Sequence, residues 1–197
     1  MERSDLEELH YITPIANVSS ILSRGILSFR RAAPLRPASV AMGAIQEKRQ
    51  KKKVPGGRAL HEYANLYICA RNPMLYKRLE QHRELCVLEV DTDVLDLPGV
   101  VIADGNAASE YTAFWPSPPG LARIDGELVF AEDWRDPDEI RYWRKKNAKC
   151  AEVLVPDRVD AGYINGVYVS CQECEQQVRR LGLNIAITVD RHLFFQG

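Results

Sequence analysis

Short apolar runs, separated by glycine, proline and asparagine, recur along the whole chain. Runs of about four to six residues rich in Val, Ile, Leu and Tyr are typical of strands in a largely buried sheet. We expect strands at residues 9–13, 66–69, 86–90, 100–103, 151–155, 164–169 and 184–189. A further extended piece is expected at 25–28, directly after a glycine.

Helical periodicity is clearest where Ile15, Val18, Ile21 and Leu22 fall three or four positions apart, just before Gly25. This spacing predicts a helix over 14–24 that ends at the glycine. We also expect helices at 73–81, 138–146 and 172–181, and short ones near 40–52 and 107–112. Residues 115–137 hold four prolines and an acidic run, so they are expected to be mostly loop.

The order of these elements determines the predicted fold class. The regular alternation of strand and helix that marks a doubly wound parallel sheet is absent. Neither a GxGxxG fingerprint nor a GxxxxGK[ST] loop occurs, so two common nucleotide-binding folds are excluded. We therefore predict an α+β domain with mostly antiparallel central β-sheets flanked by helices.

From the length of 197 residues and the composition, we expect a single domain, 1–197, without a membrane span. Apolar residues make up 46% and charged residues 27% of the chain, as in ordinary globular proteins. No run approaches the roughly 20 apolar residues that a spanning helix needs. The formal net charge of −1 argues against a protein that coats nucleic acid by bulk electrostatics.

Charge is nevertheless distributed in blocks, which changes that last inference. Residues 24–58 hold ten Lys or Arg and only Glu47 as an acid, and residues 141–149 add five more cations. Seven acids in residues 125–140 lie between them. Within the first block, 30–58 reads as a basic surface excursion, and such long excursions are usually functional or disordered. Two basic blocks are able to flank one anionic ligand, although solvated faces explain them equally well.

The five cysteines are dispersed and do not form a secreted disulfide framework. A zinc site would need a second pair or two histidines beside Cys171 and Cys174, so a chance pair is the favoured interpretation. The N-terminus lacks the apolar segment of a signal peptide, and we expect a reduced, cytoplasmic protein. The last residues resemble the remnant of a protease site, and no inference rests on Gln196 and Gly197.

Three side chains in predicted strands are candidates for chemistry. His10 lies between Leu9 and Tyr11, where a buried structural histidine is the ordinary interpretation. Glu152 and Glu89 each lie inside an apolar run, where carboxylates are seldom found unless exposed or functional. Periodicity alone does not choose between the two glutamates. A nuclease would need acids clustered around Mg²⁺, and a simple binding module would also explain the charge blocks.

Several segments together resemble one family. The stretch His10-Tyr11-Ile12-Thr13-Pro14-Ile15-Ala16-Asn17-Val18, followed by Gly25-Ile26-Leu27-Ser28, resembles the opening of ADP-ribosyltransferases. Residues 60–67, the segment Asn72-Pro73-Met74-Leu75-Tyr76, residues 104–109 and Ala151-Glu152-Val153-Leu154-Val155-Pro156 are similar, in order, to DarT. DarT enzymes are the DNA ADP-ribosyltransferase toxins of bacterial DarT–DarG toxin–antitoxin systems.

The resemblance implies an ADP-ribosyltransferase fold and transfer of ADP-ribose from NAD⁺, without a metal, to a base of single-stranded DNA. Thymine is favoured over guanine, and Glu152 over Glu89 as the catalytic glutamate, with Arg49 as the catalytic arginine. The implied NAD⁺ contacts are His10, Ile12, Thr13, Asn17, Gly25, Leu27, Arg49, Tyr67 and Arg71. The implied DNA contacts are Tyr76, Asn106, Ser109 and Lys146, with 115–150 as the substrate-recognition loop region.

The resemblance also implies a partner, the macrodomain antitoxin DarG, which removes the modification. On the physical side, Tyr111, Phe114 or Trp115 offer rings for stacking on bases, and basic residues suit DNA phosphates. Two alternatives stay open at this point. One is an ADP-ribosyltransferase that acts on protein or RNA, and the other is a non-catalytic nucleic-acid-binding module.

Overall fold

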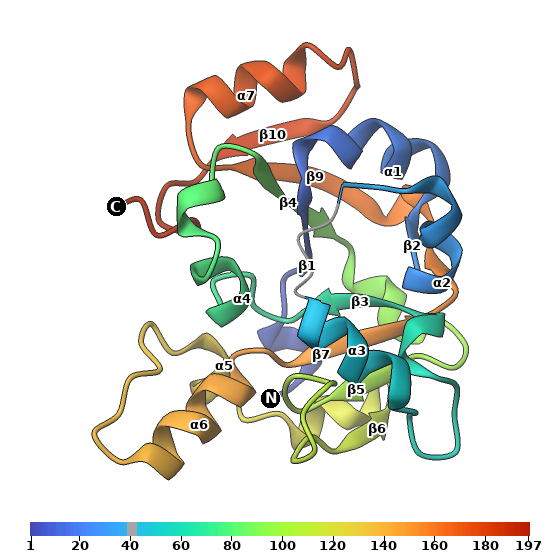
Figure 1. Cartoon of the computed structure of the whole chain (residues 1–197), viewed down its shortest axis with the longest axis vertical. Coiled ribbons are helices and arrows are strands. Elements are labelled where there is room, and N and C mark those ends of the chain that lie inside the picture. The colour runs from blue at the N-terminus through green and yellow to red at the C-terminus, as the bar shows by residue number, and fades with distance from the viewer. Residues whose placement is uncertain (39–42) are drawn as a thin grey trace.

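The computed structural model describes residues 1–38 and 43–197 (Figure 1). The helices are α1 (Val18–Arg24), α2 (Phe29–Ala32), α3 (Gly43–Lys51), α4 (Pro73–Tyr76), α5 (Gly126–Phe130), α6 (Glu139–Ala148) and α7 (Gln172–Arg179). None of the helices in the described ranges combines the length and apolar composition needed to cross a membrane. The first residues of the helix expected at 40–52 lie outside the described residues, and the rest of it is α3.

An eight-stranded sheet forms the centre of the structure, in the order β10-β9-β4-β1-β3-β7-β5-β6. Its strands are β1 (Leu9–Pro14), β3 (Tyr63–Tyr67), β4 (Leu85–Val90), β5 (Val101–Ala103), β6 (Phe114–Pro116), β7 (Glu152–Pro156), β9 (Ile164–Val169) and β10 (Ala186–Val189). Two short strands, β2 (Ile26–Leu27) and β8 (Arg158–Val159), pair separately. Among the described strands of the sheet, neighbours run antiparallel except β9 and β10, which confirms the predicted fold class.

The sheet opens at its middle, between β1 and β3. These strands share only the pair His10↔Tyr67, whereas β1 pairs with β4 along its whole length and β3 pairs with β7 over five positions. In Figure 1, β9 and β10 accordingly lie in the upper half of the view, and β5, β6 and β7 lie in the lower half. A divergence of this kind leaves strand ends and their side chains facing an open space between the two halves.

The main core covers one face of the sheet. Leu9, Leu66, Leu88 and Val153 alternate toward it and are fully buried. Residues at the intervening positions point to the opposite face, since successive strand side chains alternate. There the apolar residues form two smaller clusters, one around Ile12 and Val87 and one around Tyr63 and Leu154. The separation of these two clusters leaves room on that face for a site.

The expected strands are confirmed, although β3 begins three residues and ends two residues before the strand expected at 66–69. The helix expected over 14–24 begins as a single 3-10 turn, Ile15–Asn17. The helix over 73–81 divides into α4 and a 3-10 turn, Leu79–Gln81. The loop expected over 115–137 was partly wrong, because it contains the end of β6, a 3-10 turn at Pro119–Arg123 and α5.

The helix expected at 107–112 was wrong, since this segment is a series of turns. The side chains of Asp104, Asn106 and Ser109 accept hydrogen bonds from the backbone N–H groups of Ala113, Ala108 and Tyr111. Short polar side chains that bond nearby backbone groups compete with helix formation. The same competition explains why the segment expected to be a short helix folds as a compact loop.

The basic segment 30–58 is mostly exposed in its described part, as expected for an excursion, but it does not remain on the surface throughout. Val54 is buried, and Arg49 on α3 is only 7% exposed. An isolated antiparallel bridge between Lys53 and Ala59 closes the segment after the helix. The excursion therefore returns a charged side chain to the interior, next to the sheet.

Candidate active site

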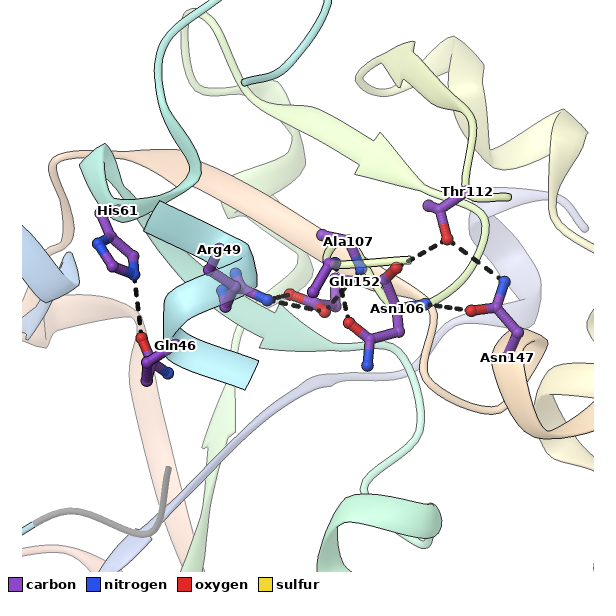
Figure 2. Close-up of polar contacts among 9 residues, drawn as sticks. Gln46, Arg49, His61, Asn106, Ala107, Thr112, Asn147 and Glu152 are labelled. Carbon is purple, nitrogen blue, oxygen red and sulfur yellow. Dashed lines mark hydrogen bonds and ion pairs between the residues drawn. The ribbon is translucent and has the colours of Figure 1, made fainter. Parts of the chain in front are cut away.

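A buried carboxylate lies at the start of β7, directly opposite Tyr67 of β3. The Glu152 side chain is 1% exposed, and both of its oxygens accept hydrogen bonds from Nη1 of Arg49, at 3.2 and 3.0 Å (Figure 2). The backbone N–H of Ala107 donates a third bond, 3.0 Å long, to Oε1. An ionised carboxylate is stable in the interior only when it is paired and hydrogen-bonded, and Glu152 meets both conditions.

Arg49 contributes a second feature to the site. Its Nη1 is used by Glu152, whereas Nη2 is buried and has no hydrogen-bond partner among the described residues. A buried guanidinium donor without an acceptor is costly, and a ligand oxygen would relieve that cost. The arrangement suits an oxygen-rich anionic ligand bound beside the Glu152 carboxylate.

The loop that supplies the Ala107 N–H is held from α6. Asn147 accepts a hydrogen bond from the Asn106 N–H at 3.2 Å and donates to Thr112 Oγ1 at 3.3 Å, and Thr112 Oγ1 donates to the Asn106 carbonyl at 2.7 Å (Figure 2). Glycine at the preceding position leaves room for this side chain, because a Cβ on Gly105 would lie 2.1 Å from Asn147 Nδ2. This network fixes the direction of the N–H group that meets Glu152.

Helix α3, which carries Arg49, is anchored on its other side by His61. The His61 Nε2 lies 3.1 Å from Gln46 Oε1, and its ring packs 4.2 Å from that of Phe29. Lys52 donates to the Ser109 carbonyl and so connects the helix end to the loop that holds Glu152. Burial, and next the positive charge of Arg49, lowers the pKa of His61, which favours the neutral ring at this contact.

A cavity of about 2030 Å³ opens above these residues, between the two halves of the sheet. Its walls come from the end of β1, α1, α3, the loop after β5, and α6. Most of the residues expected to bind NAD⁺ or DNA line it: Ile12, Thr13, Asn17, Gly25, Leu27, Arg49, Tyr67, Asn106, Ser109, Lys146 and Glu152. Burial, and next the charge of Glu152, raises the pKa of Tyr67 well above its ordinary value, so this phenol keeps its proton near neutral pH.

Three expected site residues lie outside the cavity lining formed by the described residues. His10 Nε2 contacts Glu8 Oε1 at 2.9 Å, away from the cavity. The Arg71 Nε donates to the His192 carbonyl, and its guanidinium lies 4.1 Å from the ring of Phe195. Tyr76 is 51% exposed and meets the same ring edge-on. None of the three lines the cavity in the described part of the chain, although His10 pairs with Tyr67, which does, and their ligand contacts remain predictions.

The structure separates the two candidate glutamates. Glu152 lines the cavity, whereas Glu89 lies on β4 opposite Gly166, where a Cβ on that glycine would come within 2.5 Å of its carboxylate. Burial, and next the neighbouring Glu8, raises the pKa of Glu89. In the described part of the chain, no three His, Cys, Asp or Glu side chains gather closely enough to hold a metal ion.

Some parts of the site had no signal in the sequence. The N–H of Ala107 is a backbone group, and Asn147 lies in a basic helix that reads as a solvated face. The polar turn at residues 104–106 was recognisable, but it also needs no explanation beyond turn formation. Trp143 of α6 was missed as well. It is 56% exposed, lines the cavity, and lies under the ammonium group of Lys146 at 4.6 Å from its ring centre.

The aromatic residues expected to stack on bases differ in how accessible they are. Tyr111 is 95% exposed at the edge of the cavity. The ring of Phe114 is covered by the Lys52 ammonium group at 5.5 Å, and that of Trp115 by the Arg123 guanidinium at 4.8 Å. Phe114 and Trp115 are also partly buried and are not among the described residues that line the cavity, whereas Tyr111 and Trp143 are exposed and do line it.

The sequence is similar to known proteins over most of its length. A family model described as "ssDNA thymidine ADP-ribosyltransferase, DarT" matches residues 10–195. A Thermosipho africanus protein, a fusion of DNA ADP-ribosyl transferase and DNA ADP-ribosyl glycohydrolase, is 33% identical over 95% of this chain, which spans only 49% of that protein. A DNA ADP-ribosyl transferase from Thermus sp. is 29% identical, over 88% of this chain and 86% of that relative.

Two solved structures have a fold similar to that of this chain. The Thermosipho africanus DarTG structure in complex with ADP-ribose superimposes with a TM-score of 0.83 and 33% identity, covering 96% of this chain and 51% of that one. The Thermus sp. DarT structure in complex with ADP-ribosylated ssDNA also gives a TM-score of 0.83, at 24% identity, over 96% of this chain and 97% of the other. At that identity, the second likeness shows a shared fold.

Proposed function

Because this chain belongs to the DarT family, we propose that it transfers ADP-ribose from NAD⁺ to thymine bases of single-stranded DNA and releases nicotinamide. One observation carries the proposal. The buried Glu152 carboxylate, fixed by Arg49 and the Ala107 N–H, lies at the wall of a large cavity with basic residues around it. We place the reaction in the cytoplasm, where NAD⁺ and DNA are both present.

The chemistry needs a fixed negative charge. When the bond between ribose and nicotinamide breaks, the ring nitrogen takes the bonding electrons, nicotinamide leaves neutral, and positive charge builds on the ribose. The Glu152 carboxylate is preorganised to stabilise that charge and to accept a hydrogen bond from a ribose hydroxyl. Its three hydrogen bonds keep it in place without any rearrangement during the reaction.

Arg49 has a second task in this scheme. Thymine attacks through a ring nitrogen whose proton passes to a positioned base or to water, so a negative charge develops on the base. A guanidinium in its charged form does not act as a base, but its free Nη2 donor is suited to stabilise that anion or a phosphate oxygen of NAD⁺. The same side chain thereby connects the carboxylate to the incoming nucleophile.

The walls of the cavity suit two anionic substrates. The first basic block contributes Arg24, Arg36, Lys48, Lys51, Lys52 and Lys53 to the lining, and the second contributes Arg144 and Lys146. These cations favour the pyrophosphate of NAD⁺ and the phosphates of DNA. Tyr111 and Trp143 offer exposed rings for unstacked bases, and single-stranded DNA presents such bases without the cost of unpairing.

A partner is proposed from the composition of a relative. The Thermosipho africanus protein carries a DNA ADP-ribosyl glycohydrolase in the same chain, about half of which the present chain spans. Transfer to DNA is toxic unless it is reversed, so we propose that a macrodomain antitoxin of the DarG type removes the modification made by this chain. The glycohydrolase would act on the DNA product and does not need to touch the cavity.

The decisive experiment uses NAD⁺ and matched single-stranded oligonucleotides that differ only in whether they contain thymine. We expect the mass of one ADP-ribose to be added to the thymine oligonucleotide, and Glu152→Gln to lower the rate by at least about 10²-fold. Glu89→Gln is the matched control and should retain activity. Unmodified DNA beside labelled protein or RNA would instead favour the other class of ADP-ribosyltransferase. DNA binding without nicotinamide release would favour a non-catalytic module.

A further inference from the structure

Two thiols meet at the beginning of α7, a part of the molecule that the proposed reaction does not use. The Sγ atoms of Cys171 and Cys174 lie 3.2 Å apart. Cys171 is the residue that caps the N-terminus of the helix, and Cys174 lies in its first turn. Figure 1 draws α7 at the top of the view and α6, which lines the cavity, near the bottom. The pair is thus distinct from the candidate active site.

The two cysteines differ in their surroundings. Cys174 is fully buried in the main core, where its thiol donates to the Arg83 carbonyl and contacts Ser170 Oγ. Cys171 is only partly buried and is held in an extended conformation before the helix. An accessible thiol beside a buried one is the arrangement that thiol exchange requires, since the first accepts an external sulfur and the second resolves it.

We propose that Cys171 and Cys174 form a reversible dithiol–disulfide pair that is oxidised by small disulfides of the glutathione class. The Cys171 thiolate attacks one sulfur of glutathione disulfide, and a glutathione thiolate leaves. The Cys174 thiolate then attacks the Cys171 sulfur and releases the second glutathione. In total the pair gives up two electrons and two protons, and one glutathione disulfide becomes two glutathione molecules.

The surroundings favour both steps. The contact of 3.2 Å must shorten to a bond of about 2.05 Å, a small movement at a helix terminus. Cys171 lies at the N-terminus of α7, where the helix dipole favours the negative charge that exchange places on its sulfur. The disulfide would close a loop of only two intervening residues, so it constrains the unfolded chain little. Such a bond is easily reduced again, which distinguishes a reversible pair from a structural staple.

The other cysteines provide an internal comparison. Burial raises the pKa of the Cys174 thiol, but Cys174 lies 3.2 Å from the partly exposed Cys171. Burial also raises the pKa of the Cys150 thiol to about 12 and that of Cys86 well above its ordinary range, and neither of these has such a thiol contact among the described residues. Cys69 lies 3.3 Å from the buried Lys149 ammonium nitrogen rather than at another thiol. These three residues are expected to remain reduced while Cys171 and Cys174 react.

The test equilibrates the full chain with mixtures of reduced and oxidised glutathione, followed by acid quenching, labelling of free thiols and peptide mapping. We expect Cys171 and Cys174 of the wild-type chain to become inaccessible to the thiol label together, and the intact mass before labelling to be lower by two hydrogens. Cys69→Ser should behave identically. Cys174→Ser should stop at the mixed disulfide on Cys171, and Cys171→Ser should stay reduced.

The wild-type peptide map decides the matter even where a variant fails to fold. Retention of both labels in an excess of oxidised glutathione would overturn the proposal. A stable mixed disulfide on Cys171 of the wild-type chain would overturn it as well, because Cys174 would then not resolve it. Dithiothreitol must restore both labels, and failure to do so would contradict reversibility.

Discussion

Arg49 and Glu152 meet through a single guanidinium nitrogen, with Nη1 lying 3.2 and 3.0 Å from the two carboxylate oxygens. The residues are 103 positions apart in the chain, and both side chains are almost completely buried. Neither charge is stable in this place without the other. The contact therefore explains why the basic segment returns to the interior and how β7 carries a carboxylate within an apolar strand.

The first prediction concerns the energetics of this pair. Arg49→Ala leaves a buried carboxylate without its cation, and we expect it to lower the free energy of unfolding by about 3–5 kcal/mol. The Arg49→Ala/Glu152→Gln double variant has no uncompensated charge. Its loss of unfolding free energy should therefore be smaller than the sum of the losses in Arg49→Ala and in Glu152→Gln. Urea denaturation of all four proteins measures the coupling, and strictly additive losses would contradict it.

A second prediction addresses the loop that meets Glu152. Gly105→Ala would place a Cβ 2.1 Å from Asn147 Nδ2 and displace the side chain that holds Asn106 and Thr112. The Ala107 N–H would then lose its alignment, and a misplacement of about 1 Å costs on the order of 10² in rate. Gly162→Ala is the matched control, because a Cβ there meets nothing within 4 Å. Equal transfer rates for the two variants would refute this account of the loop.

A third prediction compares two glycines with positive φ. Gly25 has φ +84°, and a Cβ there would lie 2.2 Å from the Val159 carbonyl oxygen, where β2 meets β8. Gly56 has φ +67° and open space around it. Gly56→Ala should cost only backbone strain, about 1–2 kcal/mol, whereas Gly25→Ala should cost clearly more. Thermal unfolding ranks the two, and the reverse order would show that β2 and β8 are not held together as described.

The strands and the candidate glutamates could be predicted from the sequence, but the choice of the catalytic one could not be made from the pattern of residues. Apolar runs were enough to find the described strands except the short β6 and β8, and an acid within such a run was enough to make Glu152 and Glu89 candidates. On physical grounds, only the three-dimensional structure distinguishes them, because strand pairing places Glu152 at the cavity and Glu89 opposite Gly166. A family resemblance selected Glu152 without that information.

The rest of the site was hidden for physical reasons. Arg49 stands among neighbouring cations of similar helical spacing, and only the contact with Glu152 distinguishes it. A short helix was expected at 107–112, but the side chains of Asp104, Asn106 and Ser109 bind the backbone of this loop instead. Ala107 acts through a main-chain group that every residue except proline possesses. Such features arise from tertiary contacts and leave no local pattern.

A fourth prediction concerns the exposed rings at the cavity edge. Tyr111→Ala and Trp143→Ala should each weaken binding of single-stranded DNA by about 1–3 kcal/mol, because each removes a surface on which a base stacks. NAD⁺ binding should remain unchanged in both. Phe130→Ala, which removes an exposed ring of α5, is the matched control. Fluorescence anisotropy with a labelled oligonucleotide gives the affinities, and unchanged affinity in both variants would remove these rings from the DNA site.

The last prediction uses His61 as a reporter of the Arg49 charge. Burial comes first and the Arg49 guanidinium second among the causes that lower the pKa of His61. Replacement of the cation in Arg49→Gln should therefore raise the pKa of His61 toward its ordinary value. The pKa of His82, which is lowered by burial and by Arg83, should stay as it is. NMR titration of the four histidines, with His61 assigned through His61→Asn, measures both effects.

The sign of the accompanying stability change follows from linkage. Because the folded pKa of His61 lies below its unfolded value of about 6.5, the unfolded chain binds the proton first as the pH falls. The His61 contribution to stability is complete above that value and declines as the pH falls from it toward the folded pKa. In Arg49→Gln this decline should be smaller, since the two pKa values are closer. An unchanged His61 titration in the variant would show that Arg49 does not lie beside His61 in solution.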